Sequence, residues 1–480
     1  MNNKQHHTTD WRVDDRSHKH NQRNNQDNTT AMKSVSRKLF GDPILLQDWD
    51  SEVEELSAKY WELFLDLLLV GSSSAIAGNA IVHQNLYGVA EMAVLYLVTI
   101  NSWMLYSHHY TSRFEDGSLV HSLILFPLLL GTAICIVNAS FTTASAFCFG
   151  TMLQRIFFLL ILSAVYRTIP RSRPLCLQLG AFTMAALVVF VVGILVPKYA
   201  VACLCVSIII ETFTEFVLVN TLRGRALVPI NIEHSKDRLG CMILIMLGET
   251  VVTAVISNQA ISTTAVANRS RYYWIMGLSF LLIFMFTLLF FHMQPAPEDH
   301  AFRRNRIRGC FYLLAHKFLG LALLAVGVAV RLMVKATVAG QYLTDFGVVL
   351  TGISVGSCLV ILLGIRYAHY GGVYPRPYDP PYATRIFYTW WATFFVFSMA
   401  PFILIKADMK DPVLSAAVNS GLIFALCLIE STFTHILEPF LRNSPSEEAA
   451  EKAKEQKQRD SVIENGEGQP TEGTGLLKGK

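Results

Sequence analysis

Charged residues are scarce in this chain of 480 residues, because Asp, Glu, Lys and Arg together make up 16% of it and hydrophobic residues make up 52%. Soluble globular domains carry about 25% charged residues. The charges nearly cancel, with 40 Lys and Arg against 36 Asp and Glu, and the soluble segments carry no arginine-rich stripe interleaved with aromatics. The composition therefore predicts a polytopic membrane protein and argues against nucleic acid as a partner.

Motifs of metal, thiol and nucleotide chemistry are also missing. The nine cysteines form no CxxC pair, and those inside apolar runs are typical small packing residues. His108, His109, His292 and His316 are not at HExxH spacing, and the chain has no P-loop. We therefore expect no cofactor and no metal site, and the missing P-loop argues against ATP-driven pumping by this chain.

Both ends of the chain differ in composition from its middle. Residues 1–45 are rich in Asn, Gln, His, Asp and Lys, and they lack both apolar periodicity and the design of a signal peptide. Residues 439–480 are again polar and become rich in glycine. Neither segment has enough apolar side chains to form a core, so we expect two disordered cytosolic tails around a membrane domain.

The middle of the chain contains apolar runs of about 20 residues, which is the length that a helix needs to cross the hydrocarbon of a bilayer. We therefore predict an all-α helical bundle, embedded in the lipid bilayer, with about twelve transmembrane helices. Their expected ranges are 62–82, 87–110, 118–138, 143–166, 175–196, 199–221, 239–257, 272–293, 309–334, 344–367, 384–405 and 412–438.

The charges of the loops predict the orientation of these helices. Loops after even-numbered helices, with the residues at their edges, carry fifteen Lys and Arg, whereas loops after odd-numbered helices carry six. Because short cytosolic loops collect Lys and Arg, we expect both termini in the cytosol. The sequon NRS then places Asn268 on the outer side as a candidate glycosylation site.

A short sequence match raises the option of an internal duplication. The sixth expected helix contains ETFTEFVL from Glu211, and the twelfth contains ESTFTHILEPF from Glu430. Both share TFT. A repeat of six helices keeps the same orientation in both copies, as in some transporters. This interpretation divides the membrane domain into parallel halves at 46–238 and 239–438, and chance similarity between membrane helices is the alternative.

Several ionisable residues lie inside the predicted helices, where each costs roughly 2.5–3.5 kcal/mol on insertion scales. Glu62 and Asp66 are spaced i, i+4, so they share one helix face near the cytosolic end of the first helix. Glu249 and Arg155 are expected near the midplane. The other carboxylates expected at depth or between midplane and cytosol are those of Glu211, Glu215 and Glu430.

These charges have two interpretations that the sequence leaves open. In the first, Glu62 and Asp66 form a charged cytosolic vestibule with Arg113, Arg238 and Glu249, through which water reaches the midplane. In the second, Glu62 and Asp66 pair with Arg238 and Arg113 and only hold helix ends together. Arg155 is the clear cationic residue at the midplane, so we expect it to pair with at least one buried carboxylate.

Three stretches carry a resemblance to a known family: YWELFLDLLLV from Tyr60, YSHHYTSRFED from Tyr106 and IEHSKDRLGCMILIMLGETVV from Ile232. They resemble the low-temperature requirement A (LtrA) family of multi-pass membrane proteins, over about residues 46–438. On that resemblance the motif positions, with Arg155 and the later His316 and Gly320 as further matches, are Glu62, Phe64, Asp66, Arg113, Phe114, Glu115, Arg238, Gly240, Gly248 and Glu249.

The chain departs from the family pattern at two places. The stretch TLLFFHMQ has His292 where the family's WWLYFD motif has an acid, which puts a role for that acid in doubt. Asp237 replaces the glutamate that precedes the arginine of the family's ER pair. The resemblance implies a multi-pass membrane protein, and it implies little about activity because the family name describes growth in the cold.

Three classes of function stay open. A secondary transporter of an unknown small solute or ion fits twelve helices and the midplane carboxylates, and it is the preferred hypothesis. An ion channel fits if the two halves line a pore with hydroxyls such as those of Ser72, Ser73 and Ser74. A membrane-embedded enzyme or structural protein is the third class. The oligomeric state and the transported species are not readable from the sequence.

The C-terminal tail contains a candidate address. Glu472, followed by Leu476 and Leu477, has the ExxxLL spacing of an acidic dileucine signal, which a sorting adaptor reads through an apolar slot and a basic patch. A chance match in a glycine-rich tail is the alternative. The signal predicts an endosomal, lysosomal or vacuolar membrane, and without it the plasma membrane is the default.

Overall fold

The computed structural model describes residues 42–45, 59–115, 118–222, 228–259, 269–295, 299–376 and 379–442, with the side chains of 253–259 and 439–442 left aside. Almost all of this chain is helical, as predicted. The expected tails at 1–45 and 439–480 lie largely outside the described residues, and so do Asn268, Glu472, Leu476 and Leu477.

The helices follow one another with short connections. They are α2 (Tyr60–His83), α3 (Leu86–Met104), the π-helix η1 (Leu105–Tyr110), α4 (Leu119–Val137), α5 (Ala144–Thr168), α6 (Arg173–Leu195), α7 (Ala200–Thr221), α8 (Ile232–Gln259), α9 (Arg269–His292), α10 (Ala301–Arg304), α11 (Arg306–Val338), α12 (Asp345–Tyr370), α13 (Pro381–Leu404) and α14 (Pro412–Arg442). Short 3₁₀ turns occupy Phe141–Thr143, Pro170–Ser172, Pro197–Tyr199 and Ile405–Ala407.

The strands β1 (Ile44–Leu45) and β2 (Phe114–Glu115) form a small antiparallel pair in which Ile44 lies opposite Glu115. The side chain of Glu115 accepts a hydrogen bond of 2.6 Å from Lys59 Nζ, at the residue before α2. Both side chains are more than one third exposed. This pair therefore ties the start of α2 to the segment after η1 at the surface of the protein.

Eleven helices in the described residues are long and apolar enough to cross a membrane. The sequence analysis expects about twelve spans, and the one that is not among the eleven is α8. It forms a helix of 28 residues, but the side chains of 253–259 are not described, so its apolar part falls only partly within the residues that count toward a span. The structure thus confirms an all-α multi-pass membrane protein with eleven candidate spans, whereas the division into six-helix halves stays a prediction.

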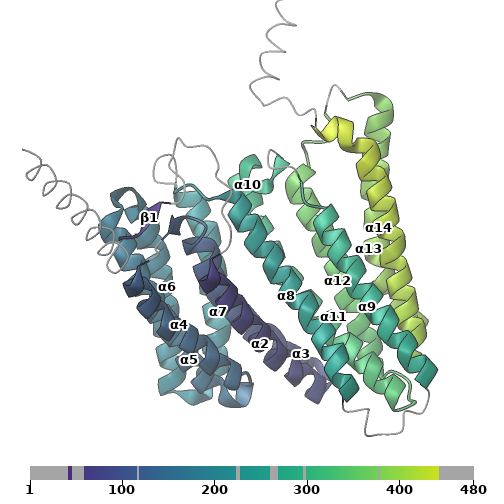
Figure 1. Ribbon diagram of the computed structural model, residues 1–480, viewed down its shortest axis with the longest axis horizontal. Coiled ribbons are helices and arrows are strands. Elements are labelled where there is room, and N and C mark those ends of the chain that lie inside the picture. The colour runs from purple at the N-terminus through teal and green to yellow at the C-terminus, as the bar shows by residue number, and fades with distance from the viewer. Residues whose placement is uncertain are drawn as a thin grey trace, which may run out of the picture. The chain divides into compact units, whose positions relative to one another are not determined.

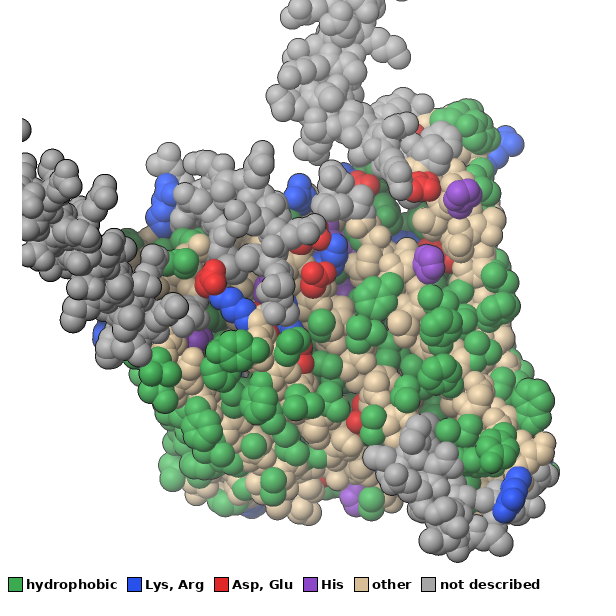
Figure 2. Space-filling view, in the orientation of Figure 1, with side chains coloured by type: hydrophobic (Ala, Val, Ile, Leu, Met, Phe, Trp, Pro, Cys, Tyr) green, Lys and Arg blue, Asp and Glu red, His purple; other side chains and the backbone are tan. Residues whose placement is uncertain are grey.

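The membrane helices carry apolar side chains outward and part of their polar side chains inward. On α2, Leu63 and Leu67 are 53% and 63% exposed, whereas Glu62 and Asp66 are 2% and 7% exposed. Hydrophobic side chains cover much of the face seen in Figure 2, with most charged side chains gathered toward one end. This pattern suits a lipid environment, where apolar side chains face the acyl chains and polar groups find partners inside.

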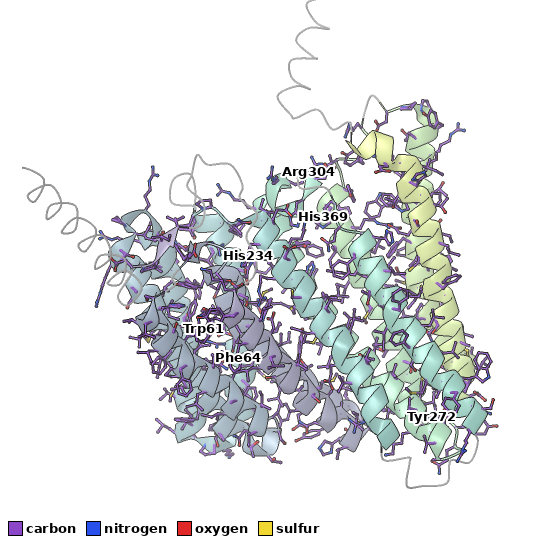
Figure 3. All side chains as sticks on the ribbon, in the orientation of Figure 1. Trp61, Phe64, His234, Tyr272, Arg304 and His369 are labelled. Carbon is purple, nitrogen blue, oxygen red and sulfur yellow. The ribbon has the colours of Figure 1, made fainter. Side chains whose placement is uncertain are left out.

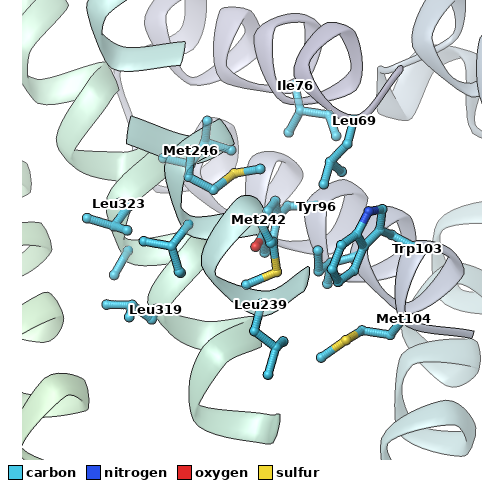
Figure 4. Close-up of a cluster of buried hydrophobic side chains, with 14 of the residues drawn as sticks. Leu69, Ile76, Tyr96, Trp103, Met104, Leu239, Met242, Met246, Leu319 and Leu323 are labelled. Carbon is cyan, nitrogen blue, oxygen red and sulfur yellow. The ribbon is translucent and has the colours of Figure 1, made fainter. Parts of the chain in front are cut away.

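The core lies where α2, α3, α8 and α11 pack together (Figure 1). Its side chains are mainly leucine, isoleucine and methionine, with Tyr96 and Trp103 of α3 among them (Figure 4). Among the eleven candidate spans, α11 is the most enclosed, since 83% of its apolar stretch is buried, against 33% for the span that contains α6. Close packing explains Gly320 of α11, because a Cβ there would overlap the Tyr96 hydroxyl.

The described chain divides into two compact units. The first runs to Gly371 and includes Thr393–Cys427, and it contains every residue of the site described below. The second combines Gly372–Ala392 with the chain from Leu428 onward. Within the second unit, Glu430 is buried, and its carboxylate accepts a hydrogen bond of 2.8 Å from Trp390 Nε1.

Candidate functional site

The π-helix η1 at the end of α3 places two adjacent histidines in the interior. Its wider turn is closed by the Thr111 N–H, which donates to the Tyr106 carbonyl at 2.9 Å. Single π-turns are rare and frequent at functional sites. His108 contacts the hydroxyl of Ser235 on α8 at 2.8 Å, whereas His109 contacts Glu215 on α7 at 3.3 Å. The turn therefore directs neighbouring imidazoles toward different helices.

A cavity of about 200 Å³ lies beside η1, between α7, α8 and α11. Most of its wall is apolar, with Phe302 and Leu313 among the lining side chains. Its polar wall is formed by the side chains of His108, His109, Arg113, Glu215 and Arg306.

Glu215 is the acidic residue in the wall of this cavity, and it has two basic partners. Its Oε1 accepts a hydrogen bond of 3.1 Å from Nζ of Lys317 on α11 and lies 3.3 Å from Nε2 of His109. Glu215 and Lys317 are 6% and 2% exposed. Because the pair is removed from water, its attraction is screened far less than that of a surface pair.

A second, smaller cavity of about 10 Å³ shares Glu215 and His109 with the first, and Lys317 lines it as well. Asn101 and Glu211 also line it. Asn101 is 3% exposed, and neither polar atom of its side chain has a hydrogen-bond partner within the described chain. A cavity of about 10–15 Å³ with several polar groups suits one water molecule.

Arg155 on α5 continues this row of buried polar groups. Its Nε donates to Glu211 Oε1 at 2.7 Å, and its Nη1 donates to the Ser102 hydroxyl at 2.7 Å. The neighbouring Gln154 donates to Thr132 at 3.0 Å. Arg155 therefore has the carboxylate partner that the sequence analysis expects, and the row extends from the larger cavity through α7 to α5, α3 and α4.

A separate ion pair joins α2 to α8. Arg238 forms two parallel hydrogen bonds to Asp66, of 2.7 Å to Oδ2 and 2.6 Å to Oδ1. The indole of Trp103 donates to Asp66 Oδ1 at 2.9 Å and also lies against the Arg238 guanidinium. Glu62, one turn earlier, contacts Nε2 of His234 at 3.2 Å. His234 is labelled in Figure 3. Arg238 is one of the two arginines expected to pair with these two carboxylates, whereas Glu62 pairs with a histidine instead.

The structure brings together some of the predicted site residues and separates others. Arg113 pairs with neither Glu62 nor Asp66; its Nη1 donates to the carbonyls of His108 and His109 at 2.9 and 3.1 Å. Glu249 is buried on α8, and Glu115 lies at the surface.

His316 belongs to a different buried cluster, where its ring packs on Tyr312, and its Nδ1 lies 2.8 Å from the Tyr312 carbonyl. His300 and His369 also pack on Tyr312, with ring centroids 4.8 and 5.1 Å away. Across the described ranges, no group of three or more His, Cys, Asp or Glu side chains is arranged to hold a metal ion.

The sequence analysis missed several residues of the site, which include His108, Arg306, Asn101, His109, His234 and Lys317. Its statement that Arg155 is the clear cation at the midplane is incomplete, because Lys317 is also buried in a span, Arg306–Val338. The signal for Lys317 was present, since it is a lysine inside an apolar run. Asn101 gave no comparable signal, because single amides are common in membrane helices.

Comparison with known proteins gives one match. A family model described as bacterial low temperature requirement A protein (LtrA) matches residues 57–430. Neither the curated proteins nor the solved structures gave a match. The matched range contains α2 through α13 and most of α14.

Proposed function

The chain belongs to the LtrA family, and we propose that it is a secondary transporter. In this proposal the larger cavity binds the solute and Glu215 couples its movement to a proton. One observation carries the proposal: Glu215 and His109 line both the larger cavity and the water-sized one, so they stand between a space for a solute and the buried row that leads to Arg155.

The chemistry of Glu215 supports a coupling role. A carboxylate that shares one oxygen between a lysine and a histidine loses both attractions when it takes up a proton, because its negative charge disappears. Lys317 and His109 are then free to change position or partner. A solute that binds one of these arrangements better than the other shifts the equilibrium between them, and this coupling is what a carrier requires.

Reconstituted protein tests this proposal. The full chain is inserted into liposomes that contain a pH-sensitive dye, and a panel of small anions, cations and neutral solutes is applied with and without a pH gradient. We expect saturable uptake linked to proton movement for at least one solute. Glu215→Gln should lower this flux by at least about ten-fold, since the amide keeps the shape but cannot change charge.

Glu233→Gln serves as the matched control. Glu233 lies on α8, is partly exposed and pairs with Lys236 at 2.5 Å, so we expect its loss to leave flux within about two-fold of the unmodified protein. If single-channel currents were recorded from the same membranes, the protein would be a channel and the carrier hypothesis would be rejected. Equal flux in Glu215→Gln and the unmodified protein, at equal amounts of folded protein, would reject the coupling role.

Orientation and address are part of the proposal. The loop charges support cytosolic termini, so a reporter fused to Lys480 should be open to a cytosolic protease, and protection of the reporter would contradict this. If Glu472, Leu476 and Leu477 form a sorting signal, changing both leucines to alanine should move the protein from an endosomal, lysosomal or vacuolar membrane to the cell surface. An unchanged distribution would leave the plasma membrane as the default.

A further inference from the structure

The wall of the larger cavity has an excess of basic groups. Its titratable side chains include His108, His109, Arg113 and Arg306, against Glu215 as the acid. The charge of Glu215 is already shared by Lys317 and His109. The cavity wall therefore offers no further carboxylate that could neutralise the two arginines.

Arg113 is the buried member of this basic wall, with 8% of its surface exposed. Its Nη1 donates to two backbone carbonyls, its Nε has no hydrogen-bond partner, and no carboxylate in the described chain forms an ion pair with it. Burial lowers the pKa of Arg113 to about 10, although the nearby charge of Glu215 acts in the opposite direction. A carbonyl satisfies a donor but does not neutralise a charge, so an anion beside Arg113 would offset the cost of burying it.

The rest of the wall is apolar and the space is small. The apolar wall includes Leu175, Leu218, Val219, Val228, Ile232 and Leu313. The volume of the cavity is about 200 Å³. This is below the ~300–1,000 Å³ of common ligand pockets, so the occupant is a small molecule.

We propose that this cavity binds a small organic monoanion, a carboxylate with a short apolar body, whose carboxylate group pairs with the guanidinium of Arg113. The planar fork of an arginine suits a carboxylate, which it binds through two parallel hydrogen bonds. The apolar body then removes hydrocarbon surface from water against the leucine and valine wall. This proposal names the class of solute for the proposed transporter. The claim that the anion is carried across the membrane rests on that proposed function.

The charge arrangement decides against the other classes of ligand. An organic cation would meet Arg113 and Arg306 and would have to compete with Lys317 for Glu215. An inorganic anion such as phosphate would leave the apolar wall unused and would lose strongly bound water on entry. A neutral amide of the same shape would fill the space but would leave the charge of Arg113 uncompensated.

Ligand-dependent thermal unfolding of the purified full chain tests the proposal without any need for flux. The probes are acetate, butyrate and benzoate, with benzamide as the neutral analogue, benzylamine as the cation and inorganic phosphate as the compact anion. A ligand that binds only the folded protein raises the unfolding temperature in a saturable manner. We expect benzoate or butyrate to bind at least about ten-fold more tightly than benzamide, benzylamine and phosphate.

Two variants locate the binding. Arg113→Gln should weaken benzoate binding at least about ten-fold, whereas Arg167→Gln, which removes an exposed arginine at the end of α5, should change it less than about two-fold. Because Arg113 also holds the carbonyls of η1, its variant risks a folding defect. Val219→Phe then serves as the second variant, because the larger side chain narrows the cavity. The affinity for benzoate should fall at least about ten-fold, while the affinity for acetate should stay within about two-fold of that of the unmodified protein.

Three results would overturn the inference: equal binding of benzamide or benzylamine, preferential binding of phosphate, or no carboxylate binding to folded protein. The proposed function fails in a different way. Carboxylate binding without any coupled flux would reject the transporter and leave the anion site in place. Saturable flux of a cation, with no carboxylate binding, would reject the anion site and leave the transporter in place.

Discussion

Asp66–Arg238 and Glu215–Lys317 are both buried ion pairs between distant parts of the chain, 172 and 102 residues apart. They are built differently. Both oxygens of Asp66 are used by Arg238, and the Trp103 indole adds a third hydrogen bond. In the Glu215 pair, one oxygen takes both Lys317 and His109, and the residue lines two cavities.

This difference separates a fixed pair from one with room to change. Within the described part of the chain, neither Asp66 nor Arg238 lines the larger cavity, the water-sized cavity or a further small cavity that Trp103 and Gln154 border. Because Arg238 and Trp103 engage both oxygens of Asp66, a second arrangement of this pair would have to break several hydrogen bonds at once. Glu215 lies beside a cavity and has two basic partners, so it can adopt a second arrangement in which it keeps only one of them. We therefore assign Asp66–Arg238 to the assembly of α2, α3 and α8.

The largest expected effect is on folding, from Arg238→Ala. The change leaves Asp66 buried without its counter-ion, which costs about 3–5 kcal/mol. Folded, monodisperse protein measured by fluorescence-detected size exclusion should fall sharply, while Arg167→Ala at the exposed end of α5 should fold normally. A normal yield of Arg238→Ala would show that the pair does not hold the helices together.

A pair of double variants sharpens the comparison. Asp66→Asn with Arg238→Gln removes both charges and keeps an acceptor for the Trp103 indole, so the loss should shrink to about 1–2 kcal/mol and flux should stay within about two-fold. Glu215→Gln with Lys317→Gln should also fold, but it should lose coupled flux by at least about ten-fold.

Thermal unfolding and liposome flux, measured on the same preparations, separate these results. If both double variants keep flux, Glu215 is as structural as Asp66. If both lose it, the fixed pair also takes part in transport, and the contrast between the two regions is wrong.

The sequence predicts the helices well because hydropathy reports which segments are apolar enough for lipid. The expected and observed ends differ by a few residues throughout, except that α8 begins at Ile232 rather than at residue 239. That difference has a physical cause. Lys236, Asp237 and Arg238 lower the hydropathy of the first turns, yet Arg238 is buried by pairing with Asp66 across the core.

The sequence predicts much less well which buried polar side chains contact one another inside the bundle. Spacing along α2 showed that Glu62 and Asp66 share a face, and the structure buries that face. It could not show that Glu62 meets His234, because this contact depends on how α8 is rotated against α2. The π-turn of η1 and the cavities depend on packing in the same way, so Asn101 and His109 emerge only from the structure.

The smallest expected effect is at the surface pair of Lys59 and Glu115. Glu115 occupies a position of the family motif, but its side chain is 38% exposed and that of its partner Lys59 is 40% exposed. Exposed pairs contribute about 0–1 kcal/mol because water and salt screen them and both side chains lose freedom. Glu115→Gln should therefore change thermal stability only slightly and leave coupled flux within about two-fold. Because salt screens this exposed pair, its loss in Glu115→Gln should lower the unfolding temperature even less at high salt than at low salt. A large loss of flux in Glu115→Gln, with the amount of folded protein unchanged, would show that a charged residue can take part in transport without lining a cavity. The pair of strands β1 and β2 would then belong to the transport pathway.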